Sequence, residues 1–130
     1  MIDHAGIGVG DYERSKAFYA GALAPLGMTL VMEPVGRAAG FGKHGRPYFW
    51  LEADRPAVTQ VHIAFEAPDR ATVDAFHAAA LEAGGTDNGG PGVREIYHPH
   101  YYGAFVLDPD GNNVEAVCHT PAREAWRVTP

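Results

Sequence analysis

Hydrophobic and polar residues alternate with a period of two at several places along the chain, which is the pattern of a strand with one buried face. In "VHIAFE" the large apolar residues Val61, Ile63 and Phe65 alternate with smaller or polar ones. Near the N-terminus, "DHAGIGVGD" alternates in the same way. The apolar residues of each stretch should pack on one face, so the pattern predicts that His4 and His62 lie on the other.

These two stretches begin two similar segments of the chain. A shift that superimposes His4 on His62 also matches residues of four other types: Asp11 with Asp69, Phe18 with Phe76, Leu23 with Leu81, and Gly27 with Gly85. Matches of such different residue types in one register indicate two copies of one structural module.

Each copy has the same order of predicted elements: a strand, an aspartate N-cap, an amphipathic helix, a terminating glycine and three further apolar stretches. The apolar stretches are "GMTLVMEP", "RAAGFGK" and "PYFWLEAD" in the first copy, and "GVREIY", "YYGAFVLD" and "NNVEAVCH" in the second, where "DPDG" predicts a hairpin turn. The sequence thus predicts an α+β domain of two βαβββ modules, about 1–55 and about 59–120, followed by a short C-terminal tail. One helix covers only one face of each sheet, so the two open faces should pair around a cleft.

Composition narrows the class of protein. The formal charge is −6 and Lys and Arg number only 10, which argues against nucleic acid as a partner. The chain has neither an apolar run long enough to span a bilayer nor a signal-like N-terminus, so no membrane partner is expected and the cytoplasm is the expected location. The single cysteine, Cys118, excludes a Cys-based zinc cluster, so any metal must be held by His and carboxylate.

A carboxylate accompanies the two histidines. Alternation in "NNVEAVCH" puts Glu115 on the face opposite Val114, Ala116 and Cys118. Two imidazoles and a carboxylate from three strands form a facial ligand set that leaves positions open for substrate or water. His4, His62 and Glu115 are therefore the candidate ligands of a divalent metal, which could be Zn, Ni, Fe, Mn or Co.

The stretches "DHAGIGVGDYERSKAFY", "VHIAF" and "AFVLDPDGNNVEAV" resemble the vicinal oxygen chelate superfamily. This superfamily includes glyoxalase I, extradiol dioxygenases, methylmalonyl-CoA epimerase, and fosfomycin and bleomycin resistance proteins. The resemblance implies a metal held by a His of the first strand, a His of the fifth and a Glu of the eighth, positions that match His4, His62 and Glu115. It also implies a homodimer, in which the cleft can combine modules of different subunits.

The fourth strand, "YFWLEAD", leaves two alternatives open. Alternation places Tyr48, Trp50 and Glu52 on one side, and glyoxalase I and the epimerases have a fourth ligand in this strand. If Glu52 binds, the resemblance implies a Lewis-acid metal that stabilises an enediolate while a carboxylate moves a proton. If Trp50 stands there, three protein ligands remain, as in the dioxygenases, which are usually longer chains.

The segment "REIYHPHYYGAF" gathers titratable and aromatic groups at the expected rim of the cleft. Polar groups that converge beside a pocket commonly orient a substrate, and a histidine with a pKa of about 6.5 can move protons at neutral pH. The candidate catalytic residues are Glu52, His98 and Tyr102. The candidate substrate-binding residues are Trp50, Arg94 and Tyr97.

The function favoured by these features is a metal-dependent enzyme that acts on a small oxygenated substrate, of the lyase or isomerase type first and a dioxygenase next. The alternative is a non-catalytic drug-binding protein of the bleomycin-resistance type, which would generally lack the three metal ligands. A purely structural metal is less favoured, because such zinc sites are normally closed by four protein ligands.

Overall fold

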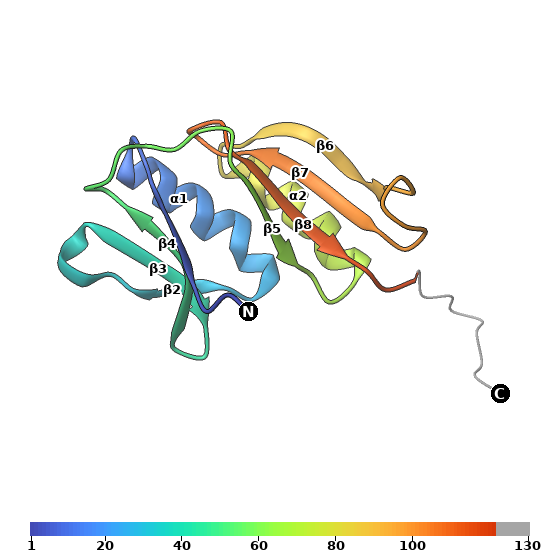
Figure 1. The fold of residues 1–130 in the computed structure, drawn as a ribbon, viewed down its shortest axis with the longest axis horizontal. Helices are drawn as coiled ribbons and strands as arrows, with labels where there is room; N and C mark the ends of the chain where they lie inside the picture. The colour runs from blue at the N-terminus through green and yellow to red at the C-terminus, as the bar shows by residue number, and fades with distance from the viewer. Residues whose placement is uncertain (122–130) are drawn as a thin grey trace.

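The computed structural model describes residues 1–121 (Figure 1). The first module contains β1 (Ala5–Gly8), α1 (Tyr12–Leu23), β2 (Thr29–Met32), β3 (Ala38–Lys43) and β4 (Arg46–Glu52), with short 3₁₀ turns at Ala24–Leu26 and Pro34–Gly36. The second contains β5 (His62–Glu66), α2 (Arg70–Glu82), β6 (Thr86–Val93), β7 (Tyr102–Leu107) and β8 (Asn113–Cys118). The expected α+β fold of two βαβββ modules is confirmed.

Each module forms one four-stranded sheet, with strand orders β1-β4-β3-β2 and β5-β8-β7-β6. The first and last strands of a module, β1 with β4 and β5 with β8, are parallel neighbours, and the other neighbours are antiparallel. The two helices lie on the same side of the molecule and leave the opposite sheet faces open (Figure 1). The first strand of each module therefore lies beside its last strand, which brings the ends of the module together in space.

Both helices begin as the sequence predicts. The Asp11 carboxylate accepts a hydrogen bond from the Arg14 N–H at 3.1 Å, and that of Asp69 accepts from the Thr72 N–H at 2.8 Å. After α1 and its 3₁₀ turn, the chain turns at Gly27, with φ of 79°. After α2, the left-handed residue is Gly84 and not the expected Gly85.

The core lies between the helices and the sheets. Phe18 of α1 and Phe76 of α2 are both fully buried, as their matching positions predict. In β4, Phe49 and Leu51 are buried on the helix side, which confirms the alternation along this strand. Leu81 matches Leu23 in the sequence, but Leu23 is fully buried whereas Leu81 is 36% exposed, so this matched pair does not have the same place in the core.

A buried polar network joins the two modules. The Tyr19 hydroxyl of α1 donates to Asp108 at 2.5 Å, although Asp108 belongs to the turn between β7 and β8. Asp108 also accepts from the backbone and side chain of Asn112, and Asn112 in turn accepts from the Val61 N–H at 3.0 Å. The predicted "DPDG" turn is confirmed, and the side chain of Asn112, which follows it, bonds the Val61 N–H just before β5 and His62.

The prediction of a strand at "GVREIY" is wrong in position. The strand β6 runs earlier, over "TDNGGPGV", and Arg94 to Tyr97 form a turn. Its pairing with β7 shifts register between Asp87 and Gly89 and again between Gly89 and Gly92. An edge strand needs no large apolar residues to pair its backbone, and bulges tolerate glycine, so hydrophobic patterning did not reveal it.

The strands β1 and β5 run in opposite directions across the molecule (Figure 1). His4 precedes β1 and His62 begins β5, so the two histidines stand at opposite ends of the seam between the modules.

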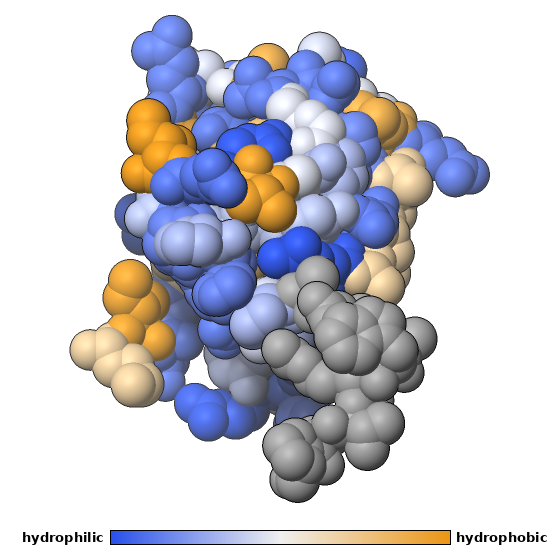
Figure 2. Space-filling view, turned by 90° about the vertical axis from the view of Figure 1, so that its right-hand side faces the viewer, coloured by the Kyte–Doolittle hydropathy of each residue, from blue (hydrophilic) through white to orange (hydrophobic). Residues whose placement is uncertain are grey.

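The face on the side of the second module is mostly hydrophilic, with apolar groups in separate small patches (Figure 2). Within residues 1–121, no helix is both long and apolar enough to cross a membrane. The expected C-terminal tail begins after residue 120, and its residues 122–130 lie outside the described part of the chain.

Candidate metal and substrate site

The open face of the second sheet carries an imidazole and a carboxylate in direct contact. In the register of β5 and β8, Glu115 lies opposite Ala64, two residues after His62, so both side chains point to the open face. His62 Nε2 lies 2.8 Å from Glu115 Oε1. The imidazole side chain is 54% exposed and that of Glu115 is 0% exposed, so solvent reaches this pair from the histidine side.

Tyr101 completes this pair. Its hydroxyl donates to Glu115 Oε2, the carboxylate oxygen that does not contact His62. Burial, followed by the contact with Glu115, raises the pKa of the Tyr101 phenol, so the phenol stays a hydrogen-bond donor at neutral pH. Room for both groups comes from Gly103 in β7, where a Cβ atom would lie 3.0 Å from Glu115 Oε2 and 3.2 Å from the Tyr101 ring.

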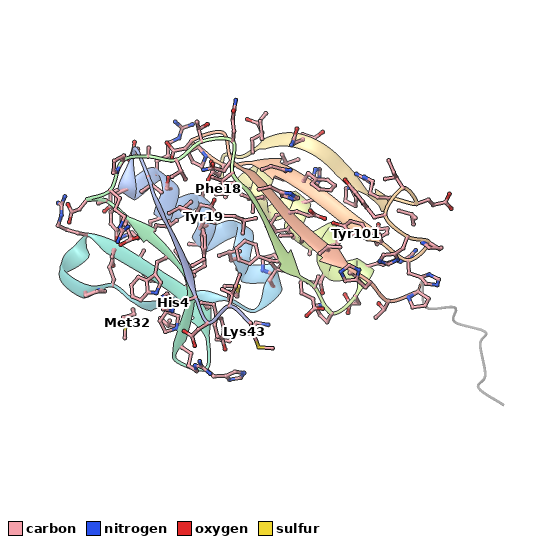
Figure 3. All side chains as sticks on the ribbon, viewed as in Figure 1. His4, Phe18, Tyr19, Met32, Lys43 and Tyr101 are labelled. Carbon is pink, nitrogen blue, oxygen red and sulfur yellow. The ribbon has the colours of Figure 1, made fainter. Side chains whose placement is uncertain are left out.

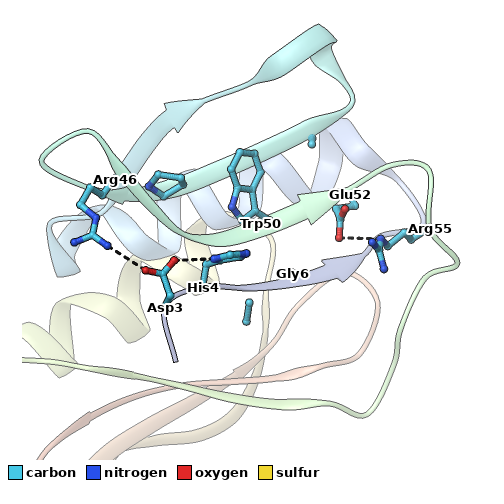
Figure 4. Close-up of a pocket in the computed structure, with 10 residues that line it drawn as sticks. Asp3, His4, Gly6, Arg46, Trp50, Glu52 and Arg55 are labelled. Carbon is cyan, nitrogen blue, oxygen red and sulfur yellow. Dashed lines mark hydrogen bonds and ion pairs between the residues drawn. The ribbon is translucent and has the colours of Figure 1, made fainter. Parts of the chain in front are cut away.

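The first module contains a pocket of about 700 Å³ on its open sheet face (Figure 4). Figure 4 shows Trp50 between two arginines, Arg46 at one end and Arg55 at the other. The Trp50 ring lies against Gly40, where a Cβ atom would come within 2.9 Å of it. The pocket is lined by Asp3, His4, Ala5, Gly6, Ala38, Arg46, Pro47, Trp50, Glu52 and Arg55.

His4 is oriented by its neighbour in this pocket. Its Nδ1 lies 2.8 Å from Asp3 Oδ1, and the other oxygen of Asp3 is 3.1 Å from Arg46. Because a carboxylate only accepts, Nδ1 is the protonated nitrogen, and Nε2 of the neutral ring carries the free electron pair. The contact with His4 is the largest cause that lowers the pKa of Asp3.

The register of the strands shows which of the two residues, Trp50 or Glu52, occupies the candidate ligand position in β4. In the second module, Glu115 lies opposite the residue two positions after His62. In the first module, the residue two positions after His4 is Gly6, and its partner is Trp50. Trp50 therefore occupies the position in β4 that Glu115 occupies in β8. Glu52 lies one pleat further along, and its carboxylate bonds Arg55 at 3.1 Å.

A single chain does not bring the three candidate ligands together. Among residues 1–121, no three His, Cys, Asp or Glu side chains converge in a group that could hold a metal ion. Figure 3 places His4 on the first module, well apart from Tyr101, which contacts Glu115 on the second. Each chain therefore carries the candidate ligands in two separate groups, which we call half-sites: His4 is one, and His62 with Glu115 is the other.

The rim residues divide between the two faces of the second sheet. His98 lies beside Tyr101, and its Nε2 is 2.8 Å from His119 Nδ1. The ring of Tyr97 lies beside that of Tyr101, with centroids 4.7 Å apart and planes tilted by 49°. The hydroxyl of Tyr102, by contrast, donates to Asp74 of α2, so this candidate catalytic residue lies on the helix side.

Tyr101 is the residue at this site that the sequence interpretation missed. The signal was present, because Tyr101 has the same parity as Gly103 and Phe105, whereas Tyr102 has the parity of the buried Ala104 and Val106. The alternation along β7 therefore predicts that Tyr101, and not Tyr102, faces Glu115.

The fold and the half-sites define a class of proteins built from paired βαβββ modules, with an imidazole and a carboxylate on an open sheet face. The family model of the glyoxalase/bleomycin resistance protein/dioxygenase superfamily matches residues 1–116, and the chain belongs to this superfamily. A comparison of the sequence with curated proteins finds no significant match.

Solved structures support the same assignment. A glyoxalase/bleomycin resistance protein from Albidiferax ferrireducens T118 is 31% identical, with a TM-score of 0.78 over 92% of this chain and 99% of that one. A putative glyoxalase from Bacillus halodurans is 26% identical, with a TM-score of 0.66 over 91% and 95% of the two chains. A lactoylglutathione lyase from Agrobacterium tumefaciens, 22% identical with a TM-score of 0.64 over 91% and 92%, shares the fold.

Proposed function

We propose that this protein is a metal-dependent enzyme that acts on a small oxygenated substrate, of the lyase or isomerase type. The observation that carries the proposal is the pair formed by His62 and Glu115, whose ligand atoms lie 2.8 Å apart on an open sheet face. Two nitrogen or oxygen ligands about 2.1 Å from one metal and at right angles to each other are about 3 Å apart, which is close to this spacing. The residues present therefore fit a divalent metal, which would take the place of the proton between His62 Nε2 and Glu115 Oε1.

The surroundings of Glu115 support the same proposal. Its carboxylate is fully buried, and within residues 1–121 its side-chain partners are His62 and Tyr101 rather than a lysine or arginine. A buried carboxylate without a permanent positive charge beside it is costly. A divalent cation at Oε1 would offset that cost, while Tyr101 holds Oε2.

The ligand set is completed, on this proposal, by His4 of a second copy of the chain. His4 stands on the other module, with Nε2 left free by its contact with Asp3. A two-fold dimer that places the first module of one subunit against the second module of the other would create two equivalent sites. Sedimentation that shows only monomer at micromolar concentration, with metal present, would contradict this part of the proposal.

The metal, when bound, would supply Lewis acidity to two adjacent substrate oxygens. The position of Trp50 favours three protein ligands, the number that the resemblance implies for the dioxygenases, and Trp50 would form a flat apolar wall for the substrate. The lyase or isomerase type is still proposed first, because the carboxylate of Glu52 lies in the same pocket as His4. Glu52 then remains as a pocket carboxylate that can take or return a proton beside the chelated oxygens. His98, half-buried at the rim, would exchange protons between the site and solvent.

The first test is elemental analysis of protein purified without added metal or chelator. We expect about one Zn, Ni, Fe, Mn or Co per chain, which His62→Ala should lose. His44→Asn is the matched control, since His44 lies in the exposed turn between β3 and β4 with φ of 53°, a conformation that asparagine tolerates.

Two outcomes would redirect the proposal. Iron together with oxygen consumption in the presence of a catechol would favour the dioxygenase reaction. Repeated absence of metal, with no uptake on titration, would refute the enzyme and leave a drug-binding protein of the bleomycin-resistance type.

A further inference from the structure

We propose that Arg94 binds an anionic group of the substrate, so that the substrate is an acid carrying an oxyanion, such as a carboxylate, in addition to the two chelating oxygens. This inference rests on the proposed function, because it assigns the class of substrate for the same site. Three observations carry it: the position of Arg94, the space that neighbouring glycines leave for its side chain, and the absence of a carboxylate partner for it among residues 1–121.

Arg94 lies on the face of the candidate metal site. Its guanidinium stands over the Phe105 ring, 5.3 Å from the centroid. Phe105 lies directly opposite Glu115 in the pairing of β7 with β8, and its ring is 6.3 Å from that of His62. A group bound at Arg94 would therefore lie beside a substrate chelated at His62 and Glu115.

The edge strand β6 leaves space for this side chain. A Cβ atom at Gly92 would lie 2.9 Å from Arg94 Nη1, and one at Gly89 would lie 3.3 Å from Nη2. Arg94 Nη2 also donates to the Gly90 carbonyl at 2.7 Å. The glycines thus let the guanidinium lie against the strand, where its side-chain hydrogen bond within residues 1–121 is the one to Gly90.

The arginines of the first-module pocket each pair with a carboxylate, whereas Arg94 has no such partner in the part of the chain that the structure describes. Arg46 pairs with Asp3 at 3.1 Å and Arg55 with Glu52 at 3.1 Å. Among residues 1–121, no Asp or Glu lies within 4.0 Å of the Arg94 guanidinium. In a chain of net charge −6, a guanidinium without a carboxylate partner on the substrate face is a specific place for an anion. Its planar fork matches the two oxygens of a carboxylate.

The test uses simple hydroxamates, which chelate a metal through two adjacent oxygens. The metal-loaded protein is titrated calorimetrically with acetohydroxamate and then with the monohydroxamates of succinic, glutaric and adipic acid. The methyl ester of each acid serves as the neutral counterpart. We expect at least one acid to bind about tenfold more tightly than its ester, which corresponds to about 1.4 kcal/mol.

Arg94→Gln should bring the ratio of acid to ester affinity to about one, with the ester as internal reference. Arg94→Lys should retain part of the ratio, because it keeps the charge without the fork. Arg14→Gln is the control: it makes the same change on the exposed side of α1, and the ratio should stay as in the wild type.

The outcomes separate the two proposals. If acetohydroxamate does not bind the metal-loaded protein, the proposed function fails and this inference fails with it. If acetohydroxamate and the esters bind but no acid binds more tightly than its ester, only the role of Arg94 is refuted. If Arg94→Gln still binds an acid more tightly than its ester, another group binds the anion and the role of Arg94 is likewise refuted.

Discussion

The substitution Tyr19→Phe tests the buried network that joins the two modules. It removes one hydroxyl, which donates to Asp108 at 2.5 Å, and leaves the aromatic ring in place. That ring packs against Phe18 and Phe49, with centroids 4.9 and 5.0 Å away, and phenylalanine would preserve both contacts. Any change in stability therefore reports mainly on the hydrogen bond.

The expected loss follows from the burial of both partners. Tyr19 is fully buried and Asp108 is only 5% exposed, so water cannot replace the missing donor. A hydrogen bond to a charged group contributes about 1.5–3 kcal/mol. Asp108 retains its bonds from Asn112 and from the Asp110 N–H, so about 2 kcal/mol is expected. For a domain of this size, that corresponds to a fall in Tm of about 6–10 °C.

The assay is urea and thermal unfolding at one fixed protein concentration, because association would couple stability to concentration. Tyr12→Phe is the matched control: its hydroxyl donates to Glu33 at 2.7 Å, but the contact is only partly buried and Glu33 keeps Lys16. The control should lose clearly less stability. A Tyr19→Phe variant within about 0.5 kcal/mol of the wild type, the range of an ordinary surface substitution, would refute the reasoning.

Three further predictions concern the site and its surroundings. Tyr101→Phe should weaken metal binding about tenfold or more in competition with a chromophoric chelator, whereas Tyr102→Phe should not, because its hydroxyl bonds the helix layer. Gly103→Ala should lower both the metal content and Tm, since its Cβ would press on Glu115 at 3.0 Å; a variant with full metal content would contradict the placement of that carboxylate. Burial raises the pKa of Tyr19 in the folded protein. Above a pH of about 10, the Tyr19 phenol therefore loses its proton in the unfolded chain but keeps it in the folded one, and the free energy of unfolding falls as the pH rises further. Thermal melts from pH 8 to 12 should therefore fall less steeply for Tyr19→Phe than for the wild type.

Much of the fold was predictable because both copies of the module follow the same local rules. Asp11 and Asp69 cap their helices, and Phe18 and Phe76 fill the core, as one shift of the sequence indicates. The edge strand β6 was not predictable from hydrophobicity, because its residues pair through the backbone and pack little.

The candidate site was predictable in its parts but not in its assembly. Alternation alone put His62 and Glu115 on one face, because it fixes the side of a sheet on which each residue lies. It cannot fix which residue of a parallel neighbour stands opposite, and that register decides between Trp50 and Glu52. Only three-dimensional pairing shows that Trp50 corresponds to Glu115.

The duplication also explains why His4 lies apart from His62 and Glu115 in one chain. The first strands of the two copies, β1 and β5, run in opposite directions (Figure 1), so His4 and His62 come to opposite ends of the seam between the modules. On the proposed function, the two modules would carry complementary parts of a site, His4 on one and His62 with Glu115 on the other, and a two-fold partner could bring each part to its complement. On this reasoning, metal affinity should depend on protein concentration: dilution below the dimer dissociation constant would separate His4 from Glu115. Affinity that stays constant across that range would mean that His62 and Glu115 bind the metal without a partner.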